Sequence, residues 1–583
     1  MTTLASSPSS VIVTLQQLIK ANASNPRLQQ PLVAMIQAAG NPNSIESIPF
    51  QQFRLDSRQL AANDVFVLLK SQTPNCQKTR DYLLQAAEKA AFVLSEIDPI
   101  ALLTPANVPP NANIQLSDNR NNDTQVNGDR PATNSQPSAQ QHLAALPCPV
   151  LYVPNIRDFL GDLIQAYLQY QQPTTLPTVA AVTGTNGKTT ISQLVAQLVQ
   201  LTGMSSAVMG TAGNGKLGAL IQASHTTGDA LAVQQFLHQM GEEGADLLAL
   251  EASSHGLDQQ RLQGMPVTVA IYTNLSRDHL DYHADMAEYV AAKAKLFDTA
   301  HFPSLTHAII NIDDEHAQIM LDTAHASNLT VWTYSLDAMS DATFIASTVE
   351  PSLQGVNITL RSAFEGNELD SSKLKNEKPS DINIVSPLLG RFNVANLLAA
   401  IAAAVALGIR LERIAAVVPQ LQGANGRMQR VPSTEGCFIV DYAHTPDALV
   451  QVLDSLRTHC RGKLWAVFGC GGDRDAGKRP LMAQAGLSGA DQVILTADNP
   501  RTEDPNIILK DMQAGMSVEQ YQRTHIEPAR QKAIEYAVAH ASPDDIVVIA
   551  GKGHETYQEI NGVRHDFDDS IILKQALQQA GHL

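Results

Sequence analysis

Apolar residues in this chain fall into short β-branched runs and longer stretches with helical spacing, and the two kinds alternate. The run Thr178–Thr183 predicts a buried strand, and the apolar stretch from Ile191 to Leu201 predicts the helix that follows it. The C-terminal third repeats the pattern, with predicted strands at 464–468, 492–496 and 545–550. Alternating strands and helices are typical of α/β proteins, so we expect mostly parallel sheets.

The first 170 residues predict a smaller α/β domain with a polar interruption. A strand at 64–69 precedes a helix at 82–91, and a strand at 150–153 precedes a helix at 156–170. Between these pairs, residues 105–141 are rich in Asn, Gln, Pro and Ser and nearly lack large apolar side chains. Such a segment cannot bury enough surface to offset its ordering entropy, so we interpret it as a disordered surface insertion.

A chain of 583 residues is long enough for about three or four domains. The breaks in the pattern predict three: residues 1–172, a central domain at 173–424 and a C-terminal domain at 425–583. A glycine-rich stretch at 421–428 predicts a hinge between the last two. A second polar stretch, at 363–379, predicts a loop within the central domain.

Composition narrows the function classes. A formal net charge of −17 argues against nucleic acid as the main partner, because no basic face would neutralise phosphates. Five cysteines show no C-x-x-C pairing, which suits a reducing cytoplasm, and we see no signal peptide. The longest apolar run, 397–409, is too short to span a bilayer and predicts a buried helix instead. We therefore expect a cytoplasmic protein with no membrane partner, and we expect a monomer.

The turn TGTNGKTT after the first central strand carries the strongest chemical signal. Gly184 and Gly187 permit a tight turn whose backbone N–H groups converge on phosphate oxygens. Lys188 can reach the terminal phosphates, and the hydroxyl of Thr189 suits a magnesium ion. The spacing G-x-x-G-K-T is two residues shorter than the usual P-loop. A structural turn with an exposed lysine is the alternative, and we favour nucleoside triphosphate binding.

Two further strand ends in the central domain carry metal-compatible side chains. The predicted strand 246–251 ends in Glu251, and the predicted strand 267–274 is followed by a turn that contains His279. Ligands of open α/β sheets lie beyond the carboxyl ends of the strands, so both side chains are expected near Thr189 around a divalent metal. A histidine in such a turn, taken alone, is as often structural.

The predicted helix 286–297 contains a lysine on its apolar side. Helical spacing puts Lys293 in the stripe formed by Tyr289, Val290 and the neighbouring apolar residues, whereas Lys295 points away. A buried lysine needs a carboxylate partner, a lowered pKa or a modification. A neutral amine beside a metal can react with carbon dioxide to give an anionic carbamate ligand. A lysine that snorkels to the surface is the alternative, and helical position alone does not decide between them.

Charged, glycine-rich loops follow three strands of the C-terminal third. They cover 469–480, 497–502 and 551–555, and three such loops at successive strand ends predict a pocket for an anionic or zwitterionic ligand. In the first domain, LDSR at 55–58 offers a hydroxyl and backbone amides to a phosphate, although by itself it more readily reads as a plain turn.

Taken together, the motifs carry a family resemblance. TGTNGKTT, the run EASSHGL, TNLSRDHLDYH, YVAAKAKLF, GRFNVAN, DYAHTPD, GGDRDAGKRP, DNPR and GKGHE occur here in one order. This set resembles the Mur ligases, and within them the MurE type. The resemblance covers nearly the whole chain. It implies an N-terminal domain for a UDP-linked substrate, a central ATPase domain and a C-terminal Rossmann-like domain.

The resemblance also implies a reaction. MurE-type enzymes use ATP and Mg²⁺ to join an amino acid to UDP-N-acetylmuramoyl-L-alanyl-D-glutamate through an acyl phosphate, in cytoplasmic peptidoglycan precursor synthesis. Arg501 in DNPR resembles the enzymes that take meso-2,6-diaminopimelate, because a guanidinium pairs with the carboxylate that lysine lacks. Glu555 is expected to recognise the distal ammonium and Arg474 the other carboxylate. Closure of the domains around the substrates is expected.

Carried over position by position, the resemblance implies five sets of site residues. The expected ATP-binding positions are Gly184, Thr185, Asn186, Gly187, Lys188, Thr189, Thr190, Asn274, Asn393, Asn396, Arg427, Asp441 and His444. The positions expected to bind the UDP-linked substrate are Leu55, Ser57, Thr226, Thr227, Ser253, Gln259 and Arg261. Those expected to bind diaminopimelate are Arg474, Asp498, Asn499, Pro500, Arg501, Gly551 and Glu555. The expected metal ligands are Thr189, Glu251, His279 and carbamylated Lys293. The expected catalytic residues are Lys188, Glu251, His279 and Lys293.

Two departures and three rival classes remain open at this point. The insertion at 105–141 has no counterpart in the family pattern, and residues 70–75 replace its usual glycine-rich UDP loop. The first rival is a sister ligase, such as a lysine-adding MurE, a dipeptide-adding Mur ligase or a folylpolyglutamate synthase; DNPR and LDSR argue against it. The second is an ATPase that drives only a conformational change. The third is an inactive scaffold, against which the intact Lys188 and Lys293 argue.

Overall fold

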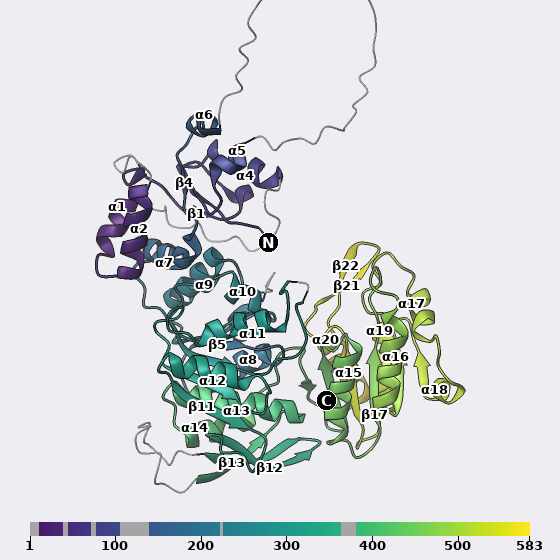
Figure 1. The fold of residues 1–583 in the computed structure, drawn as a ribbon. Coiled ribbons are helices and arrows are strands. Elements are labelled where there is room, and N and C mark those ends of the chain that lie inside the picture. Colours follow the sequence, from purple (N-terminus) through teal and green to yellow (C-terminus); the bar gives the residue numbers. More distant parts are fainter. Residues whose placement is uncertain are drawn as a thin grey trace, which may run out of the picture. The chain divides into compact units, whose positions relative to one another are not determined.

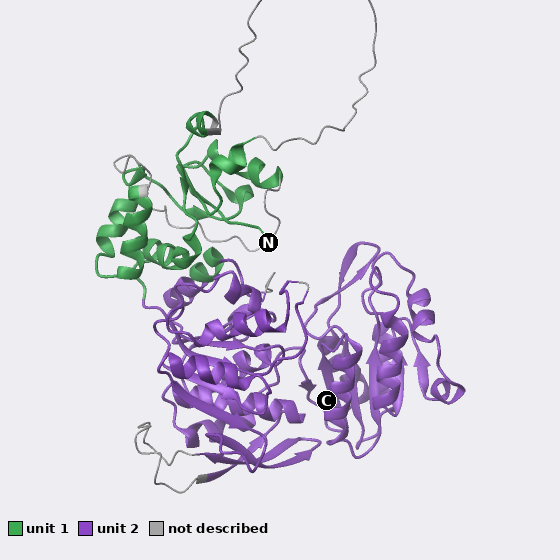
Figure 2. Ribbon diagram, in the orientation of Figure 1, with its two compact units in different colours: residues 1–174, 230–235 green, residues 175–229, 236–583 purple. Residues whose placement is uncertain are grey.

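The computed structural model describes residues 11–38, 45–71, 77–104, 139–221, 226–280, 282–362 and 380–583. The chain forms two compact units (Figure 2). Unit 1 comprises residues 1–174 with 230–235, and unit 2 comprises residues 175–229 with 236–583. Unit 1 therefore includes residues 230–235, the first part of helix α9 (Ala230–Glu242), from within the predicted central domain.

Unit 1 is built on a small parallel sheet with the strand order β1-β2-β3-β4 (Figure 1). Its strands are β1 (Phe53–Arg54), β2 (Val65–Leu68), β3 (Phe92–Ser95) and β4 (Val150–Tyr152). Its helices are α1 (Leu15–Ala21), α2 (Pro26–Ala38), η1 (Ser57–Gln59), α4 (Gln77–Ala87), α5 (Pro99–Leu103), α6 (Ala139–Ala144), η2 (Ile156–Asp158) and α7 (Leu160–Gln171). The expected small α/β domain is therefore present.

Two predictions for unit 1 need correction. The helix expected at 82–91 lies at Gln77–Ala87, because the backbone N–H of Ala91 donates to the carbonyl of Asp64 and already leads into strand β3. Of the insertion expected at 105–141, residues 105–138 lie outside the described residues, whereas residues 139–141 begin helix α6. The loop expected at 363–379 likewise lies outside the described residues.

The larger sheet of unit 2 has ten strands in the order β14-β13-β12-β11-β10-β9-β5-β8-β6-β7. Its strands are β5 (Thr178–Thr183), β6 (Ser206–Gly210), β7 (Gly213–Lys216), β8 (Leu247–Glu251), β9 (Val267–Tyr272), β10 (His307–Asn311), β11 (Thr330–Ser335), β12 (Phe344–Ser352), β13 (Gly355–Ser362) and β14 (Ser380–Ser386). The seven from β12 to β6 pair in parallel, and β7, β13 and β14 are antiparallel. The mostly parallel central sheet is therefore confirmed.

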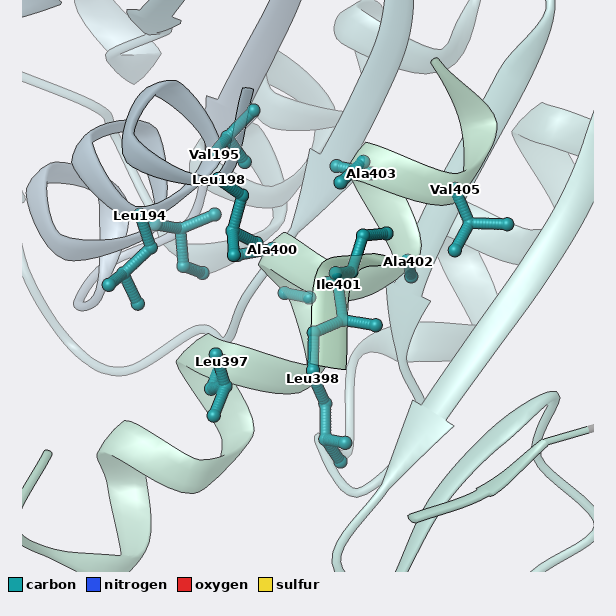
Figure 3. Packing of buried hydrophobic residues seen from close by; sticks show 14 of the residues in the cluster. Leu194, Val195, Leu198, Leu397, Leu398, Ala400, Ile401, Ala402, Ala403 and Val405 are labelled. Atoms are coloured by element: carbon teal, nitrogen blue, oxygen red, sulfur yellow. The ribbon is translucent and has the colours of Figure 1, made fainter. Parts of the chain in front are cut away.

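Helices accompany this sheet as the alternation predicts. They are α8 (Lys188–Leu201), α9 (Ala230–Glu242), α10 (Ser254–Asp258), α11 (Met286–Ala294), η3 (Lys295–Phe297), α12 (Ala317–Ala326), α13 (Arg391–Ala406), α14 (Leu411–Val417) and η5 (Val418–Gln420). Helix α13 is apolar nearly all round, as expected of a helix buried on every side. Leu194 and Leu198 of α8 lie in one buried cluster with Leu397, Leu398 and Ile401 of α13 (Figure 3). This packing fixes helix α8, which starts at the glycine turn after β5.

The C-terminal part of unit 2 has a six-stranded sheet in the order β15-β16-β20-β17-β18-β19. Its strands are β15 (Gln429–Val431), β16 (Cys437–Asp441), β17 (Leu464–Phe468), β18 (Gln492–Leu495), β19 (Thr524–Ile526) and β20 (Ile546–Ala550), and a separate hairpin is formed by β21 (Tyr557–Ile560) and β22 (Val563–Asp566). Its helices are α15 (Pro446–Arg457), α16 (Lys478–Gly489), α17 (Pro505–Met512), α18 (Val518–Gln522), α19 (Arg530–His540) and α20 (Asp569–Ala580). Strands β16, β20, β17 and β18 are neighbours, so the charged loops after them meet at one edge.

In the described part of the chain, no helix has the length and apolar character needed to cross a membrane. The four described cysteines, Cys148, Cys437, Cys460 and Cys470, are free thiols.

Candidate active site

The turn between β5 and α8 accepts only glycine at two positions. Gly184 has φ +146°, and a Cβ there would lie 1.9 Å from Oγ1 of Thr273. Gly187 caps helix α8 with φ +88°, and a Cβ there would lie 2.6 Å from Oδ1 of Asn396. The backbone is therefore free to approach a bound anion at the start of α8, where the helix dipole and unpaired N–H groups favour negative charge.

The end of strand β9 holds this turn in place. Thr185 donates its backbone N–H to the carbonyl of Asn274 at 2.8 Å, and Asn186 donates to Oδ1 of Asn274 at 3.0 Å. The hydroxyl of Thr273 donates to the carbonyl of Asn186 at 2.6 Å. Because β9 is the immediate neighbour of β5 in the sheet, these bonds are local and rigid. Asn274, one of the expected ATP positions, thus positions the turn itself.

Two lysines converge on one carbonyl of the turn. Lys188 donates Nζ to the carbonyls of Gly184 and Thr185, each at 2.8 Å. Lys293 donates Nζ to the same carbonyl of Gly184 at 2.8 Å. Burial lowers the pKa of Lys188, and the negative charge of Glu251 only partly opposes this. The turn therefore holds Lys188 beside the place where phosphates would lie.

Lys293 is buried, as its helical position predicted. It is 1% exposed, and Nζ lies 4.4 Å from the ring centroid of Tyr289. Burial, together with the charge of Lys188, holds the pKa of Lys293 well below its usual value. Among the described residues, no carboxylate lies within ion-pairing distance of Lys293, whereas Lys295 pairs with Asp258 at 2.8 Å. The geometry favours an uncharged amine at position 293, so the snorkelling alternative is wrong.

Glu251 and His279 lie at the ends of the strands that flank the turn. The carboxylate of Glu251 is 2% exposed and accepts the backbone N–H of Thr211 at 2.8 Å and its hydroxyl at 3.2 Å. His279 has φ +54°, a strained backbone for a residue with a side chain. Its ring is 40% exposed, lies 3.5 Å from Asp278 and stands 6.0 Å from the ring of Tyr289.

The residues at this edge of the sheet fit a magnesium ion provided that Lys293 carries a carbamate. Among the described residues, no group of three or more His, Cys, Asp or Glu side chains is placed to hold a metal. The expected set supplies one carboxylate, one imidazole and the hydroxyl of Thr189 in the first turn of α8. Mg²⁺ prefers oxygen ligands, and the carboxylate of Glu251 has acceptor sites beyond the two bonds to Thr211. A carbamate on Lys293 would add the second anionic oxygen ligand.

The asparagines expected near the nucleotide come from the first turns of α13. Asn393 is 3% exposed and donates Nδ2 to the carbonyl of Leu389 at 2.8 Å. Asn396 is 7% exposed and donates Nδ2 to Oδ1 of Asn393 at 3.1 Å. The close approach of Asn396 to Gly187 brings α13 against the phosphate-binding turn, whose last residue, Thr190, is buried. The structure thus brings these three expected residues together.

The remaining expected ATP positions lie at the hinge. Asp441 is 5% exposed and accepts the backbone N–H groups of Met428 and Ala443, each at 2.7 Å, while burial raises its pKa. The guanidinium of Arg427 lies 4.6 Å from the ring centroid of Tyr442. His444 bonds through Nδ1 to the carbonyl of Tyr442 at 2.9 Å. Asp441 therefore fixes the path of the chain from the hinge into strand β16.

The expected muramoyl-dipeptide residues form one network in unit 2. Thr227 donates Oγ1 to the carbonyl of Glu251 at 2.9 Å and contacts Oγ of Ser253 at 3.0 Å. Arg261 donates to the carbonyl of Thr227 at 3.0 Å and to Oε1 of Gln259 at 2.7 Å. The hydroxyl of Thr226 lies 3.0 Å from that of Thr211, which also holds Glu251. These side chains are thus connected to the expected metal site.

The two expected UDP contacts belong to unit 1 and are described there alone. Leu55 follows strand β1 and packs against the core of that unit. Ser57 begins η1, and the carboxylate of Asp56 caps this turn by accepting the N–H of Arg58 at 3.0 Å. This geometry is compatible both with a plain structural turn and with a turn that contacts a phosphate, so it does not decide between the two interpretations of LDSR. Of the altered loop at 70–75, residues 72–75 lie outside the described residues.

The expected diaminopimelate residues meet around the ends of β18 and β20. Asn499 donates Nδ2 to Glu555 at 2.9 Å. Gly551 has φ +115°, and a Cβ there would lie 2.8 Å from Oδ2 of Asp498. Arg501 has φ +51° and donates Nη1 to the carbonyl of Gly472 at 2.7 Å, and Gly472 passes close to the carbonyl of Pro500.

Arg474 lies close to Arg501, because a Cβ at Gly471 would be 2.8 Å from Nη1 of Arg501 and 3.8 Å from Cγ of Arg474. Its guanidinium donates to the carbonyl of the neighbouring Asp473 at 3.3 Å, in an exposed bond. The loop that carries it is nevertheless fixed, because Asp473 accepts from the hydroxyl of Thr502 at 2.7 Å and Gly472 donates to the carbonyl of Asn499 at 2.9 Å.

Sequence reasoning missed two residues of the site. The sequence places Tyr289 only in the apolar stripe, yet its hydroxyl lies 3.1 Å from that of Thr185 and its ring lies under the Nζ atom of Lys293. Lys552 was passed over, yet it is fully buried and bonds to Asn499 at 3.0 Å and Glu555 at 3.2 Å. The position of Lys552 inside the motif GKGHE, next to the expected site residues Gly551 and Glu555, could have indicated its part in the site.

Two family models match the chain. The Mur ligase middle domain matches residues 182–404, and the Mur ligase, glutamate ligase domain matches residues 426–553. A UDP-N-acetylmuramoyl-L-alanyl-D-glutamate–2,6-diaminopimelate ligase of Haemophilus ducreyi is 39% identical over 538 residues, covering 91% of this chain and 96% of that protein. The ligase of the same name from Ectopseudomonas mendocina is 46% identical over 410 residues, covering 70% of this chain and 79% of its own length.

Solved structures agree with these matches. One titled as a UDP-N-acetylmuramoyl-L-alanyl-D-glutamate–2,6-diaminopimelate ligase has a TM-score of 0.67 at 39% identity, covering 98% of this chain and 100% of that one. MurF from Acinetobacter baumannii has a TM-score of 0.54 at 16% identity, over 98% of this chain and 100% of its own. A Mycobacterium tuberculosis folylpolyglutamate synthase complexed with ADP has a TM-score of 0.50 at 18% identity, over 68% and 91%. The latter two share the fold alone.

Proposed function

This chain belongs to the Mur ligase family, and from that premise we propose that it adds meso-2,6-diaminopimelate to UDP-N-acetylmuramoyl-L-alanyl-D-glutamate at the expense of ATP. The observation that carries the proposal is the 39% identity to a ligase of that name over 96% of its length. The pocket around Arg501 supports the choice of amino acid. The reaction is a step of peptidoglycan precursor synthesis, and its place is the cytoplasm.

The first half of the reaction activates a carboxylate. An oxygen of the D-glutamate carboxylate attacks the γ-phosphorus of ATP, ADP leaves, and an acyl phosphate forms. Lys188 and the backbone N–H groups of the turn at 184–190 are placed to stabilise the charge of the transferring phosphoryl group. Magnesium, held by Thr189, Glu251, His279 and carbamylated Lys293, would supply further charge neutralisation.

The second half forms the amide. The uncharged amine of diaminopimelate attacks the acyl carbon, phosphate leaves, and the nitrogen loses a proton. Thr227, Ser253 and Arg261 hold the muramoyl-dipeptide end beside Glu251, as their shared network supports. Asn499, Arg501 and Glu555 hold the distal end of the amino acid. Leu55 and Ser57 contact the UDP portion, and Arg427, Asp441 and His444 meet the nucleotide when the domains close.

The carbamate on Lys293 is part of the proposal. An uncharged Nζ attacks carbon dioxide, a proton is released, and the side chain becomes an anion. Burial against Tyr289 and the lowered pKa support this chemistry. Asn393 and Asn396 shape the nucleotide end of the same site through their contact with Gly187.

The test of the proposal is phosphate release by the purified chain with ATP, Mg²⁺, UDP-muramoyl-dipeptide and diaminopimelate, each omitted in turn. We expect release to require all four components. Rapid release without the amino acid would instead support an ATPase that drives a conformational change. No release under any condition would support an inactive scaffold.

A further inference from the structure

A fully buried lysine stands behind the amino-acid pocket. Lys552 follows strand β20, has no exposed surface, and donates Nζ to Oδ1 of Asn499 at 3.0 Å and to Oε2 of Glu555 at 3.2 Å. The carboxylate of Asp498 forms an ion pair with it, with Oδ1 of Asp498 3.7 Å from Nζ. Because Lys552 has no exposed surface, it does not reach a substrate and acts through the residues that it holds.

The same contacts fix the directions of the pocket side chains. With Oδ1 of Asn499 held by Lys552 and by the backbone N–H of Glu559 at 2.9 Å, Nδ2 of Asn499 can only point to Glu555. Glu555 thus receives one donor from Lys552 and one from Asn499 at the same oxygen, Oε2. Its other carboxylate oxygen stays available for a ligand ammonium.

Five charged side chains are linked to one another around Asn499, and the formal charges of these five sum to one negative charge. Asp498, Glu555 and Glu559 are acidic, while Lys552 and Arg501 are basic, and Arg501 Nε lies 4.0 Å from Glu559. Behind them, Arg530 and Asp569 form a fully buried pair at 2.7 Å that is neutral as a whole. Exposed Arg564, over the ring of Tyr557 at 4.2 Å, is more strongly screened by water.

We propose that Lys552 is a specificity-determining positioning residue, which balances the pocket for an amino acid whose distal end carries both an ammonium and a carboxylate. The inference rests on the proposed function. The distal end of diaminopimelate is a zwitterion with no net charge, whereas that of L-lysine is a lone cation. Without the positive charge of Lys552 the site would be more negative by one unit, and the added negative charge attracts the lone cation more than the zwitterion.

The test is the ratio of kcat/KM for diaminopimelate to kcat/KM for L-lysine in Lys552→Met, which keeps the unbranched stem of the side chain and removes the charged amine. We expect this ratio to fall about tenfold or more, as loss of one buried charge-assisted contact implies, with the KM for ATP unchanged. Lys295→Met, which removes a half-buried lysine paired with Asp258 outside the pocket, should leave the ratio at the wild-type value. Equal losses for both amino acids would overturn the inference.

A second variant keeps the test decisive if Lys552→Met does not fold. Glu555→Gln removes a negative charge, so the same electrostatic argument predicts a ratio at or above that of the wild type. A lower ratio in Glu555→Gln would overturn the inference. Wild-type protein measured in parallel separates the two proposals, because failure to ligate diaminopimelate at all would contradict the proposed function and not the role of Lys552.

Discussion

The Nζ atoms of Lys188 and Lys293 both lie 2.8 Å from the carbonyl oxygen of Gly184. One lysine comes from the phosphate-binding turn and the other from helix α11, more than a hundred residues later. Burial lowers the pKa of both lysines, and the charge of Lys188 lowers that of Lys293 further, whereas the carboxylate of Glu251 partly opposes the shift of Lys188. We therefore expect Lys188 to keep its charge more readily than Lys293.

Lys293→Ala is expected to abolish ligation and to leave the fold intact. Loss of the carbamate would remove an anionic oxygen from the metal site, so activity should fall by more than about 100-fold. The variant should still unfold cooperatively, although at a lower temperature, because the bond to the carbonyl of Gly184 is lost and a cavity is left behind. A short carboxylate such as acetate at high concentration should restore part of the activity.

Lys295→Ala is the matched control, since Lys295 is two residues away and pairs with Asp258. It should keep nearly full activity. Mass spectrometry or electron density that showed unmodified Lys293 in active, magnesium-loaded protein would contradict the carbamate.

Gly187→Ala tests the close approach of α13 to the phosphate-binding turn. The new Cβ would meet Oδ1 of Asn396 at 2.6 Å in a backbone with φ +88°. Gly218 also has φ +88°, but a Cβ there meets nothing within 4 Å. Both substitutions add backbone strain of about 1–2 kcal/mol. Only Gly187→Ala should also raise the KM for ATP, by about tenfold. Equal KM values for ATP in the two variants would show that the close contact between Gly187 and Asn396 does not affect ATP binding.

We propose that the choice of amino acid depends on Arg501. Arg501→Ala, and also Arg501→Lys, should raise the KM for diaminopimelate by an amount equivalent to about 2–5 kcal/mol, because a charge-paired contact is lost. Lysine at this position keeps the charge and loses the bidentate fork. The KM for ATP should hardly change. Arg457→Ala, at an exposed ion pair with Asp491, is the control and should leave both constants alone. An unchanged KM for diaminopimelate in Arg501→Ala would refute the assignment.

His459 predicts a pH dependence of stability. The ring is 4% exposed, bonds through Nδ1 to the carbonyl of Ser352 at 2.8 Å, and accepts the N–H of Gly390 at Nε2 at 2.9 Å. Only the neutral ring satisfies both bonds, and burial lowers its pKa below the ordinary 6.5. The unfolded chain therefore binds the proton more readily. The stability that His459 contributes is full above pH 6.5 and is lost as the pH falls through the lowered folded pKa.

The measurement is the unfolding free energy in denaturant between pH 7.5 and 5 for wild type and His459→Gln. The wild type should lose up to about 1.4 kcal/mol per pH unit more than the variant within that window. Parallel pH profiles for the two proteins would show that the histidine is not held neutral.

Much of the fold follows from local pattern. The strands at 178–183 and 464–468 lie where the apolar pattern predicted them, and the buried helix predicted at 397–409 is present as α13, which begins six residues earlier and ends at Ala406. Lys293 is on the buried side of α11 because helical spacing alone decides that side. Whether each of these segments is a helix or a strand depends on residues close by in the sequence, so one sequence without relatives is enough to predict it.

The rest depends on contacts that no local pattern carries. Lys552 bonds to Asn499, 53 residues away, and that pairing exists only because β20 and β18 both flank β17 in the six-stranded sheet. The early end of α4 at Ala87 is likewise set by the pairing of Ala91 with Asp64. The pattern predicts Tyr289 as a core residue because its ring is buried. The contact of its hydroxyl with the hydroxyl of Thr185 depends on a residue far away in the sequence.

The most direct test of the central claim is a competition between two amino acids. Purified protein receives ATP, Mg²⁺ and UDP-N-acetylmuramoyl-L-alanyl-D-glutamate with equal concentrations of meso-diaminopimelate and L-lysine, and mass spectrometry identifies the UDP-linked product. The account predicts a product that has gained one diaminopimelate less one water, with one ADP and one phosphate formed for each. A product that contains lysine in comparable amount, or ADP without any new amide, would contradict it.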